Sequence, residues 1–207
     1  MKWLRFFFIC CLLGLCSPVL RSQTPASVLE NVSKALLEGQ GVSADFVINS
    51  ADVQSRGSIL LRGDKFVLDT EGARTFFDGK TQWTYLFKSN EVNISNPEQE
   101  EIQFIHPYAW LTSYKTKYRV KFGKAKLYRG QNIFEVVMTA KQPGDIICIV
   151  VYVLKESYLP IRLSMVGNTE DVTTISILKY KKDQLHADNE FTFDVSKYPG
   201  CEVIDLR

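Results

Sequence analysis

The hydrophobic pattern of this chain changes from a helical period to a strand period near residue 41. Thr24 and Pro25 precede apolar residues spaced three and four apart, which predicts an amphipathic helix with a hydroxyl cap and a proline in its first turn. Gly39 and Gly41 are predicted to end this helix. Polar and apolar residues then alternate in short segments, as they do in antiparallel strands. The strands predicted in this first series are 44–49, 57–62, 65–70, 74–78, 82–87 and 92–95.

Turn residues separate these strands and predict hairpins between them. Gly63, Gly79 and Asn90 stand where a tight turn needs a positive φ, which glycine and asparagine tolerate. A short helix that starts with proline is predicted at 107–111, after the acidic stretch 97–101. A second series of strands is predicted at 118–122, 126–129, 134–139, 146–154, 160–166, 172–180, 190–194 and 201–205.

So many strands joined by hairpins predict a single large antiparallel sheet. Such a sheet must curl on itself to bury its apolar face. We therefore expect a mainly β fold with a few helices. Segment 146–154 is apolar at both alternating sets of positions, so this strand is expected to be covered on both faces.

The first residues have the order of a secretory signal peptide. Lys2 and Arg5 precede an apolar run over 6–15, and Ser17-Pro18 breaks it. The run is too short to span a membrane as a helix. With cleavage after Ser22, the leader is 1–22 and the mature chain 23–207 forms a single soluble domain outside the cytosol.

Cys16 offers an alternative, because a lipid-modified cysteine can become the mature N-terminus. That processing needs a small residue directly before the cysteine, and Leu15 stands there, which disfavours lipidation. Cys148 and Cys201 remain after cleavage. A bridge between them is permitted in an oxidising compartment, but the position of Cys148 inside an apolar strand favours a free thiol.

The small net positive charge of the full sequence comes from the leader. Losing three of 25 basic residues leaves 22 against 23 acidic ones. A near-neutral mature chain gives no electrostatic case for nucleic acid or for a strongly anionic membrane surface as a partner.

The sequence offers few groups for chemistry. His106 and His186 have no metal-ligand spacing beside them, and no nucleophile elbow or phosphate-binding glycine loop occurs. Asp69 and Glu71 are two apart on a strand that runs into a turn, a placement typical of solvated carboxylates. We therefore expect no enzyme, no metal and no cofactor.

Aromatic residues are concentrated on the predicted strands. Trp83, Tyr85 and Phe87 alternate with other residues, so their rings share one face of a strand, and Phe66 and Leu68 form a similar pair on an earlier strand. Two interpretations stay open at this level, an ordinary aromatic core and the lining of an apolar cavity inside the curled sheet.

An ordered set of motifs resembles the periplasmic outer-membrane lipoprotein carriers of the LolA type and runs through most of the mature chain. Its members, after the N-terminal helix, are a strand with Phe46, Gly57-Ser-Ile-Leu-Leu-Arg62, Lys65-Phe66, Asp78-Gly79-Lys80-Thr81-Gln82-Trp83-Thr84-Tyr85, Pro107 with Leu111, Phe191-Thr-Phe193, Pro199-Gly200 and Val203-Ile204-Asp205. The resemblance implies an unclosed β-barrel, or half-barrel, with helices that cap a hydrophobic cavity. It also implies a monomeric periplasmic carrier that moves acylated lipoproteins from an inner-membrane release complex to an outer-membrane acceptor.

The resemblance further implies roles for particular residues. Arg62 matches an arginine that hydrogen-bonds the lid helices, although Gly63 stands where the family usually has proline. The residues expected to line the acyl-chain cavity are Phe46, Phe66, Leu68, Trp83, Tyr85, Phe87, Tyr108, Trp110 and Leu111.

Two other functions remain open. The same half-barrel could carry or sense another lipid or a glycolipid in the cell envelope. A filled core would instead make it a structural envelope domain that binds no lipid.

Overall fold

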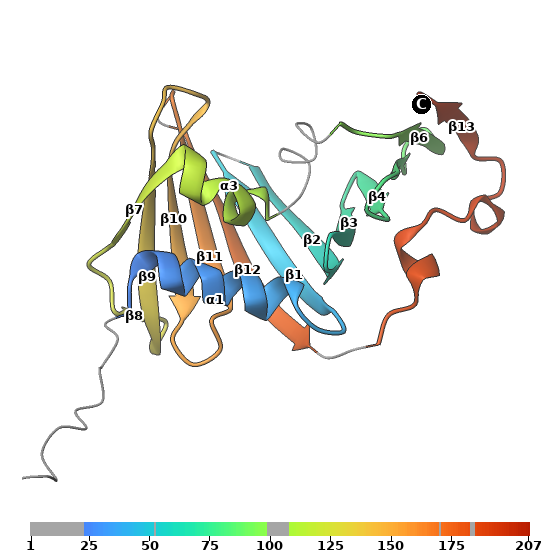
Figure 1. The fold of residues 1–207 in the computed structure, drawn as a ribbon. Helices are drawn as coiled ribbons and strands as arrows, with labels where there is room; N and C mark the ends of the chain where they lie inside the picture. Colours follow the sequence, from blue (N-terminus) through green and yellow to red (C-terminus); the bar gives the residue numbers. More distant parts are fainter. Residues whose placement is uncertain (1–22, 52, 99–107, 170, 183–184) are drawn as a thin grey trace, which may run out of the picture.

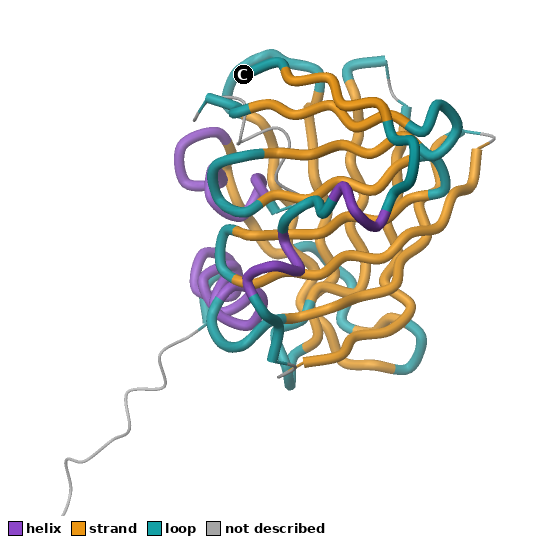
Figure 2. The backbone as a smooth tube through the Cα atoms, turned by 90° about the vertical axis from the view of Figure 1, so that its right-hand side faces the viewer, coloured by secondary structure: helices purple, strands orange, loops and turns teal. Residues whose placement is uncertain are grey.

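A computed structural model describes residues 23–51, 53–98, 108–169, 171–182 and 185–207. The expected leader therefore lies outside the described residues. Figure 1 shows a large curled sheet with two helices on its concave side, and Figure 2 shows the C-terminal segment crossing the opposite, outer side.

Helix α1 spans Pro25–Leu37 and begins as its sequence predicts. The Thr24 hydroxyl accepts a hydrogen bond from the Ser27 N–H at 3.1 Å, and the Ser27 hydroxyl accepts one from the Thr24 N–H at 3.0 Å. This reciprocal cap satisfies donors that have no partner within the helix. The apolar side of α1 is buried against the sheet through Val28, Leu29, Val32 and Leu36.

The strands form one sheet of thirteen. Their order is β13-β6-β5-β4-β3-β2-β1-β12-β11-β10-β9-β7, with β8 also paired to β9. All neighbours run antiparallel except β13, which runs parallel to β6. Their bounds are β1 Val42–Ser50, β2 Val53–Arg62, β3 Lys65–Thr70, β4 Ala73–Phe77, β5 Gln82–Leu86, β6 Glu91–Ser95, β7 Tyr118–Phe122, β8 Leu127–Tyr128, β9 Gln131–Ala140, β10 Ile146–Leu154, β11 Pro160–Gly167, β12 Val172–Lys182 and β13 Glu202–Asp205.

The strand register assigns each side chain to one face of the sheet. Ile59 pairs with Leu68 and Leu61 with Phe66. Ile59, Leu61 and Phe66 are buried in the core on the concave face, and the half-buried Leu68 packs against it. Leu60 and Asp69 belong to the alternate rows, which form the outer face. Helices α1 and α3 (Ala109–Lys117) cover the concave face and complete the main core.

The predictions from the sequence were wrong for three segments. Residues 190–194 form no strand, because two short 3-10 helices, Asp188–Phe191 and Val195–Lys197, occupy this region. Helix α3 continues to Lys117, whereas the prediction ended it at residue 111, and Pro107 lies outside the described residues. Strand β10 is fully buried on one face only, since Ile149, Val151 and Val153 are buried whereas the alternate residues Cys148, Val150, Tyr152 and Leu154 are half-buried.

Cys148 and Cys201 are both free thiols, as the position of Cys148 suggested. Burial raises the pKa of the Cys148 thiol, so it remains protonated near neutral pH. None of the helices in the described part of the chain is long and apolar enough to cross a membrane. Across those same residues no cluster of His, Cys, Asp and Glu could hold a metal ion.

Candidate ligand-binding cavity

An apolar cavity of about 210 Å³ lies on the concave side of the sheet, between its central strands and helix α3. An apolar cavity of about 150 Å³ already holds a benzene-sized ligand. This one therefore has room for a longer piece of hydrocarbon. Its lining consists of Phe46, Ile48, Ile59, Leu68, Tyr108, Trp110, Pro160, Arg162, Leu163, Ile175 and Ile177.

The polar groups around this cavity are neutral or engaged elsewhere. The hydroxyls of Tyr108 and Tyr180 hydrogen-bond to each other, and the Tyr180 hydroxyl donates to the Pro160 carbonyl at 2.6 Å. Burial raises the pKa of both tyrosines, so neither carries charge near neutral pH. The Arg162 guanidinium stacks over the rings of Tyr128 and Tyr152. The cavity is thus suited to an uncharged apolar ligand.

A larger cavity of about 470 Å³ lies between the outer face and the C-terminal segment, but its chemistry is different. Its lining includes Asp45, Asp69, Arg74, Lys181 and Asp194. Charged groups remain hydrated at such a site, so it does not suit a hydrocarbon chain. We take the smaller apolar cavity as the candidate site.

Gly57 gives the Phe46 ring its place in the lining. Phe46 and Gly57 are paired across β1 and β2, beside a bulge at Asp45/Phe46. A Cβ at position 57 would lie 2.5 Å from the Phe46 ring and 2.4 Å from the Asp69 carbonyl oxygen. Only glycine therefore leaves room for the Phe46 ring at its observed position.

Gly57→Ala is expected to lower the free energy of unfolding by about 1–3 kcal/mol, as overpacked sites do. The added methyl group must displace either the Phe46 ring or strand β3. Urea unfolding measures this change. Gly72→Ala is the matched control, since nothing lies within 4 Å of a Cβ there. Equal stability of the two variants would contradict the assigned packing.

Four of the residues expected to bind acyl chains line the cavity, namely Phe46, Leu68, Tyr108 and Trp110. Two more, Phe66 and Leu111, are buried in the adjacent core. The Phe66 ring packs on Phe77 with its centroid 5.4 Å away. The sequence missed the aliphatic part of the lining on β1, β11 and β12, although the alternation of Ile175 and Ile177 was a usable signal.

Trp83, Tyr85 and Phe87 do not reach this cavity, which corrects their expected placement. Cross-strand pairing sets Trp83 beside Phe76, and Tyr85 beside Arg74, on the outer face. The Tyr85 ring packs against Phe193 and Tyr198 of the C-terminal segment, with centroid distances of 5.8 and 4.4 Å, and Phe87 is 41% exposed. The period of two showed correctly that the rings share a face, but it carries no information about which face is concave.

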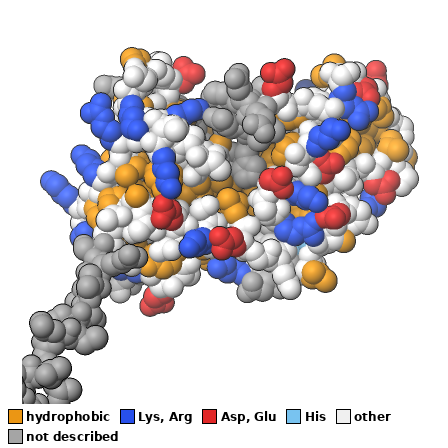
Figure 3. All heavy atoms as spheres, viewed as in Figure 1, with side chains coloured by type: hydrophobic (Ala, Val, Ile, Leu, Met, Phe, Trp, Pro, Cys, Tyr) orange, Lys and Arg blue, Asp and Glu red, His pale blue; other side chains and the backbone are white. Residues whose placement is uncertain are grey.

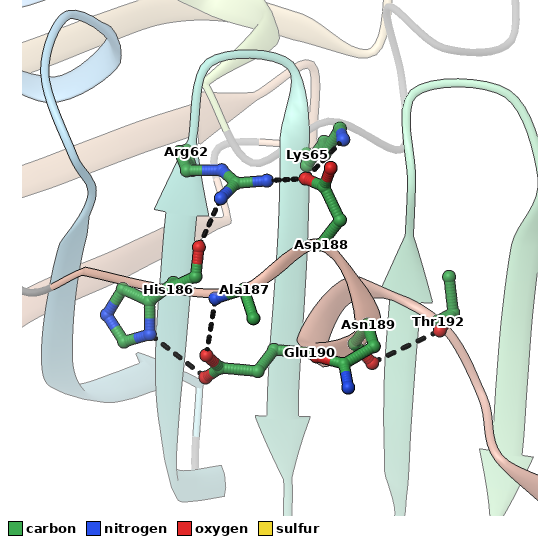
Figure 4. A network of polar contacts seen from close by, with 8 residues as sticks. All are labelled: Arg62, Lys65, His186, Ala187, Asp188, Asn189, Glu190 and Thr192. Carbon is green, nitrogen blue, oxygen red and sulfur yellow. Dashed lines mark hydrogen bonds and ion pairs between the residues drawn. The ribbon is translucent and has the colours of Figure 1, made fainter.

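Arg62 binds the C-terminal segment, whereas the resemblance placed it against the lid helices. Figure 4 shows its guanidinium donating to the His186 carbonyl and to the Asp188 carboxylate, which also receives Lys65 Nζ at 2.9 Å. The guanidinium also lies over the Phe191 ring, 4.9 Å from its centroid. The reason is register, because Arg62 follows Leu61 of the concave row and so points to the outer face.

A second set of contacts fixes the backbone that Arg62 binds. Glu190 accepts a hydrogen bond from the Ala187 N–H at 2.8 Å and pairs with His186 Nδ1 at 2.9 Å (Figure 4). These hydrogen bonds hold the pKa of Glu190 below its usual range. Residues 186–190 therefore form a small ordered turn that presents its carbonyl and carboxylate to Arg62.

Arg62→Leu is expected to lower the free energy of unfolding by about 1.5–3 kcal/mol, the contribution of hydrogen bonds to a charged group. Affinity for a fatty-acid probe should change less than about twofold, because the cavity lies on the other face. Urea unfolding and a probe titration on the same variant separate these effects. A large change in probe affinity with unchanged stability would contradict this assignment and support a role for Arg62 in holding the lid helices.

The curled sheet, the helices on its concave side and the covered apolar cavity define an unclosed β-barrel built around a hydrophobic site. Residues 17–168 match the model of a family described as outer membrane lipoprotein carrier protein LolA. Because this match covers more than half of the sequence, the chain belongs to that family. No curated protein matches it.

Solved structures with a TM-score of 0.50 or more share the fold of this chain. An uncharacterized conserved protein from Thermus thermophilus has a TM-score of 0.61 at 15% identity, covering 86% of this chain and 96% of that one. The MucA/MucB complex of Pseudomonas aeruginosa has a TM-score of 0.50 at 10% sequence identity, and the match covers 83% of this chain and 61% of that one. A LolA superfamily protein from Nitrosomonas europaea has a TM-score of 0.44 at 10% sequence identity, and the match covers 83% of this chain and 99% of that one. Identities this low concern the fold alone.

Proposed function

We propose that this protein is a periplasmic carrier that holds the acyl chains of lipoproteins and moves them from the inner to the outer membrane. The observation that carries the proposal is the apolar cavity beneath helix α3, whose tyrosine hydroxyls are uncharged. Membership of a family described as a lipoprotein carrier supports the choice of cargo. An inner-membrane release complex and an outer-membrane acceptor are the partners that this role requires.

Burial alone holds the acyl chain in this proposal, with no covalent step, no cofactor and no enzymatic activity. Each methylene removed from water contributes about 0.8 kcal/mol. A whole acyl chain buried in this way would be released too slowly for a carrier. A cavity of about 210 Å³ buries only part of the chain, so affinity stays moderate and transfer remains possible.

Uptake of a fluorescent fatty acid, followed by its displacement with a triacylated lipopeptide, tests this function. We expect saturable uptake of the fatty acid and competition by the lipopeptide. Uptake without competition would assign the cavity to a free lipid or a glycolipid. If neither ligand binds, the carrier proposal fails and a structural role in the envelope replaces it.

A further inference from the structure

One edge of the sheet carries a run of basic residues in a stretch of sequence that has no acidic residue. The sequence contains no Asp or Glu from 102 to 134, yet it has seven basic residues within 115–129. They lie at the end of α3, along β7 and in the loop that leads through β8. We call them the basic edge, and they are Lys115, Lys117, Arg119, Lys121, Lys124, Lys126 and Arg129.

All seven side chains of the basic edge are exposed. Lys115 forms an ion pair with Glu30 at 3.0 Å. Among the described residues no ion pair involves Arg119, Lys121, Lys124, Lys126 or Arg129. Glu135 on the neighbouring strand β9 is engaged with the backbone, since its carboxylate accepts the Ala125 N–H at 2.8 Å.

Several cations in the opposite half of the molecule are paired with carboxylates. There Arg62 and Lys65 share Asp188, Arg74 pairs with Asp69, and Arg207 pairs with Asp205. The charges of those residues are used within the fold. The five cations of the basic edge that form no ion pair in the described part of the chain remain available to an external anion.

The geometry of β7 arranges this charge in a line. Strand β7 is the last in the sheet and pairs only with β9. Its alternate residues Tyr118, Val120 and Phe122 are half-buried against the core, so Arg119 and Lys121 point outward. Figure 3 shows Lys and Arg side chains gathered along the side of the molecule where α3 and β7 lie.

An exposed apolar side chain accompanies these cations. Leu127, at the start of β8, is 62% exposed between Lys126 and Arg129. Cations attract anionic headgroups, and an adjacent apolar side chain gains by entering the boundary between headgroups and acyl chains. A purely polar polyanion offers nothing to Leu127, so this combination favours a lipid surface.

We infer that the basic edge is a docking surface for an anionic phospholipid bilayer. This inference rests on the proposed function, in which cargo comes from a membrane and returns to one. Helix α3 connects the two sites, because Trp110 near its start lines the cavity and Lys115 and Lys117 near its end belong to the basic edge. Docking along this edge brings the helix that covers the cavity to the membrane surface.

Co-sedimentation of the mature chain with vesicles tests the inference. One set is phosphatidylcholine alone, and in the other about a third of the lipid is phosphatidylglycerol. We expect binding to the anionic vesicles only, with strong weakening at high salt. Lys121→Glu, Lys124→Glu and Lys126→Glu together should weaken it at least about tenfold. Leu127→Ser should weaken it while leaving the salt dependence in place.

The matched control changes three exposed lysines away from the basic edge, Lys80→Glu, Lys88→Glu and Lys182→Glu. This variant alters net charge equally and should bind nearly as the wild type does. Equal weakening by both triple variants would overturn the inference, as would equal binding to the two kinds of vesicle. Binding to polyglutamate but not to vesicles would also overturn it and identify an acidic protein as the partner.

Failure of docking and failure of the carrier function can be told apart. Uptake of the fluorescent fatty acid in vesicle-free solution should be unchanged in the triple variant of the basic edge. If uptake is absent while anionic vesicles still bind the wild type, the proposed function fails and the docking surface stands. Normal uptake without vesicle binding gives the reverse result.

Discussion

Ile177→Trp is expected to weaken binding of a fatty-acid probe by about 15- to 60-fold. Ile177 lies opposite Phe46 on β12 and lines the cavity, so a larger ring occupies space that the ligand needs. Excluding two or three methylenes removes about 0.8 kcal/mol each, which gives this range. A fluorescence titration with the purified variant measures it.

The neighbouring residue supplies a close control for this prediction. Leu178 follows Ile177 on the same strand but is 57% exposed on the outer face. Leu178→Trp should therefore leave probe affinity within about twofold of the wild type. If the two variants behave alike, the ligand does not occupy the concave cavity.

Phe191→Ala is expected to lower the free energy of unfolding by about 3–5 kcal/mol, the usual cost of truncating a buried phenylalanine. Phe191 is fully buried at the end of a 3-10 helix that packs on β3, and the Arg62 guanidinium lies over its ring. Its removal takes away the main apolar anchor of the C-terminal segment. Urea unfolding gives the stability change.

Phe87→Ala serves as the control because the Phe87 side chain is 41% exposed. We expect it to cost under about 1 kcal/mol. Limited proteolysis adds a local reading, since cleavage should begin after residue 182 in Phe191→Ala and not in Phe87→Ala. A small stability change in Phe191→Ala would show that the C-terminal segment contributes little to the fold.

Much of the fold follows from local signals in the sequence. The first helix was predictable because its cap, proline and apolar spacing all agree. Strands β3, β7 and β10 begin and end where the pattern places them, since alternation and turn residues are local. The conformation of residues 186–197 was not predictable, because it depends on Arg62 and on the outer face of strands far away in sequence. The strand predicted at 201–205, by contrast, is present as β13.

The cavity was predictable only in part, for a related reason. Alternation shows which residues share a face, and Trp83 and Tyr85 do share one. The choice between the concave and the outer face is made by the curl of the whole sheet and by what covers each side. Phe193 and Tyr198 cover the outer face at this point. The sequence around residue 83 gives no signal that these distant residues pack there.

The basic edge could not be predicted from net charge, because net charge does not show how charged residues are distributed over the surface. Residues 23–207 contain nearly equal numbers of acidic and basic residues, which led us to expect no attraction to an anionic surface. Alternation along β7 spaces its cations two apart, so they do not form a contiguous basic run. The sheet brings them together on one side, whereas Arg62 and Arg74 on the other side are paired with carboxylates.

Photolabelling with a diazirine-bearing fatty acid, read by peptide mass spectrometry, shows directly whether an acyl chain occupies the concave cavity. We expect labels on residues of the concave face, in the peptides that contain Phe46, Trp110 and Ile177. Unlabelled fatty acid should prevent them. Labels confined to the outer-face aromatics Tyr85 and Phe193, or no competable label at all, would contradict this prediction.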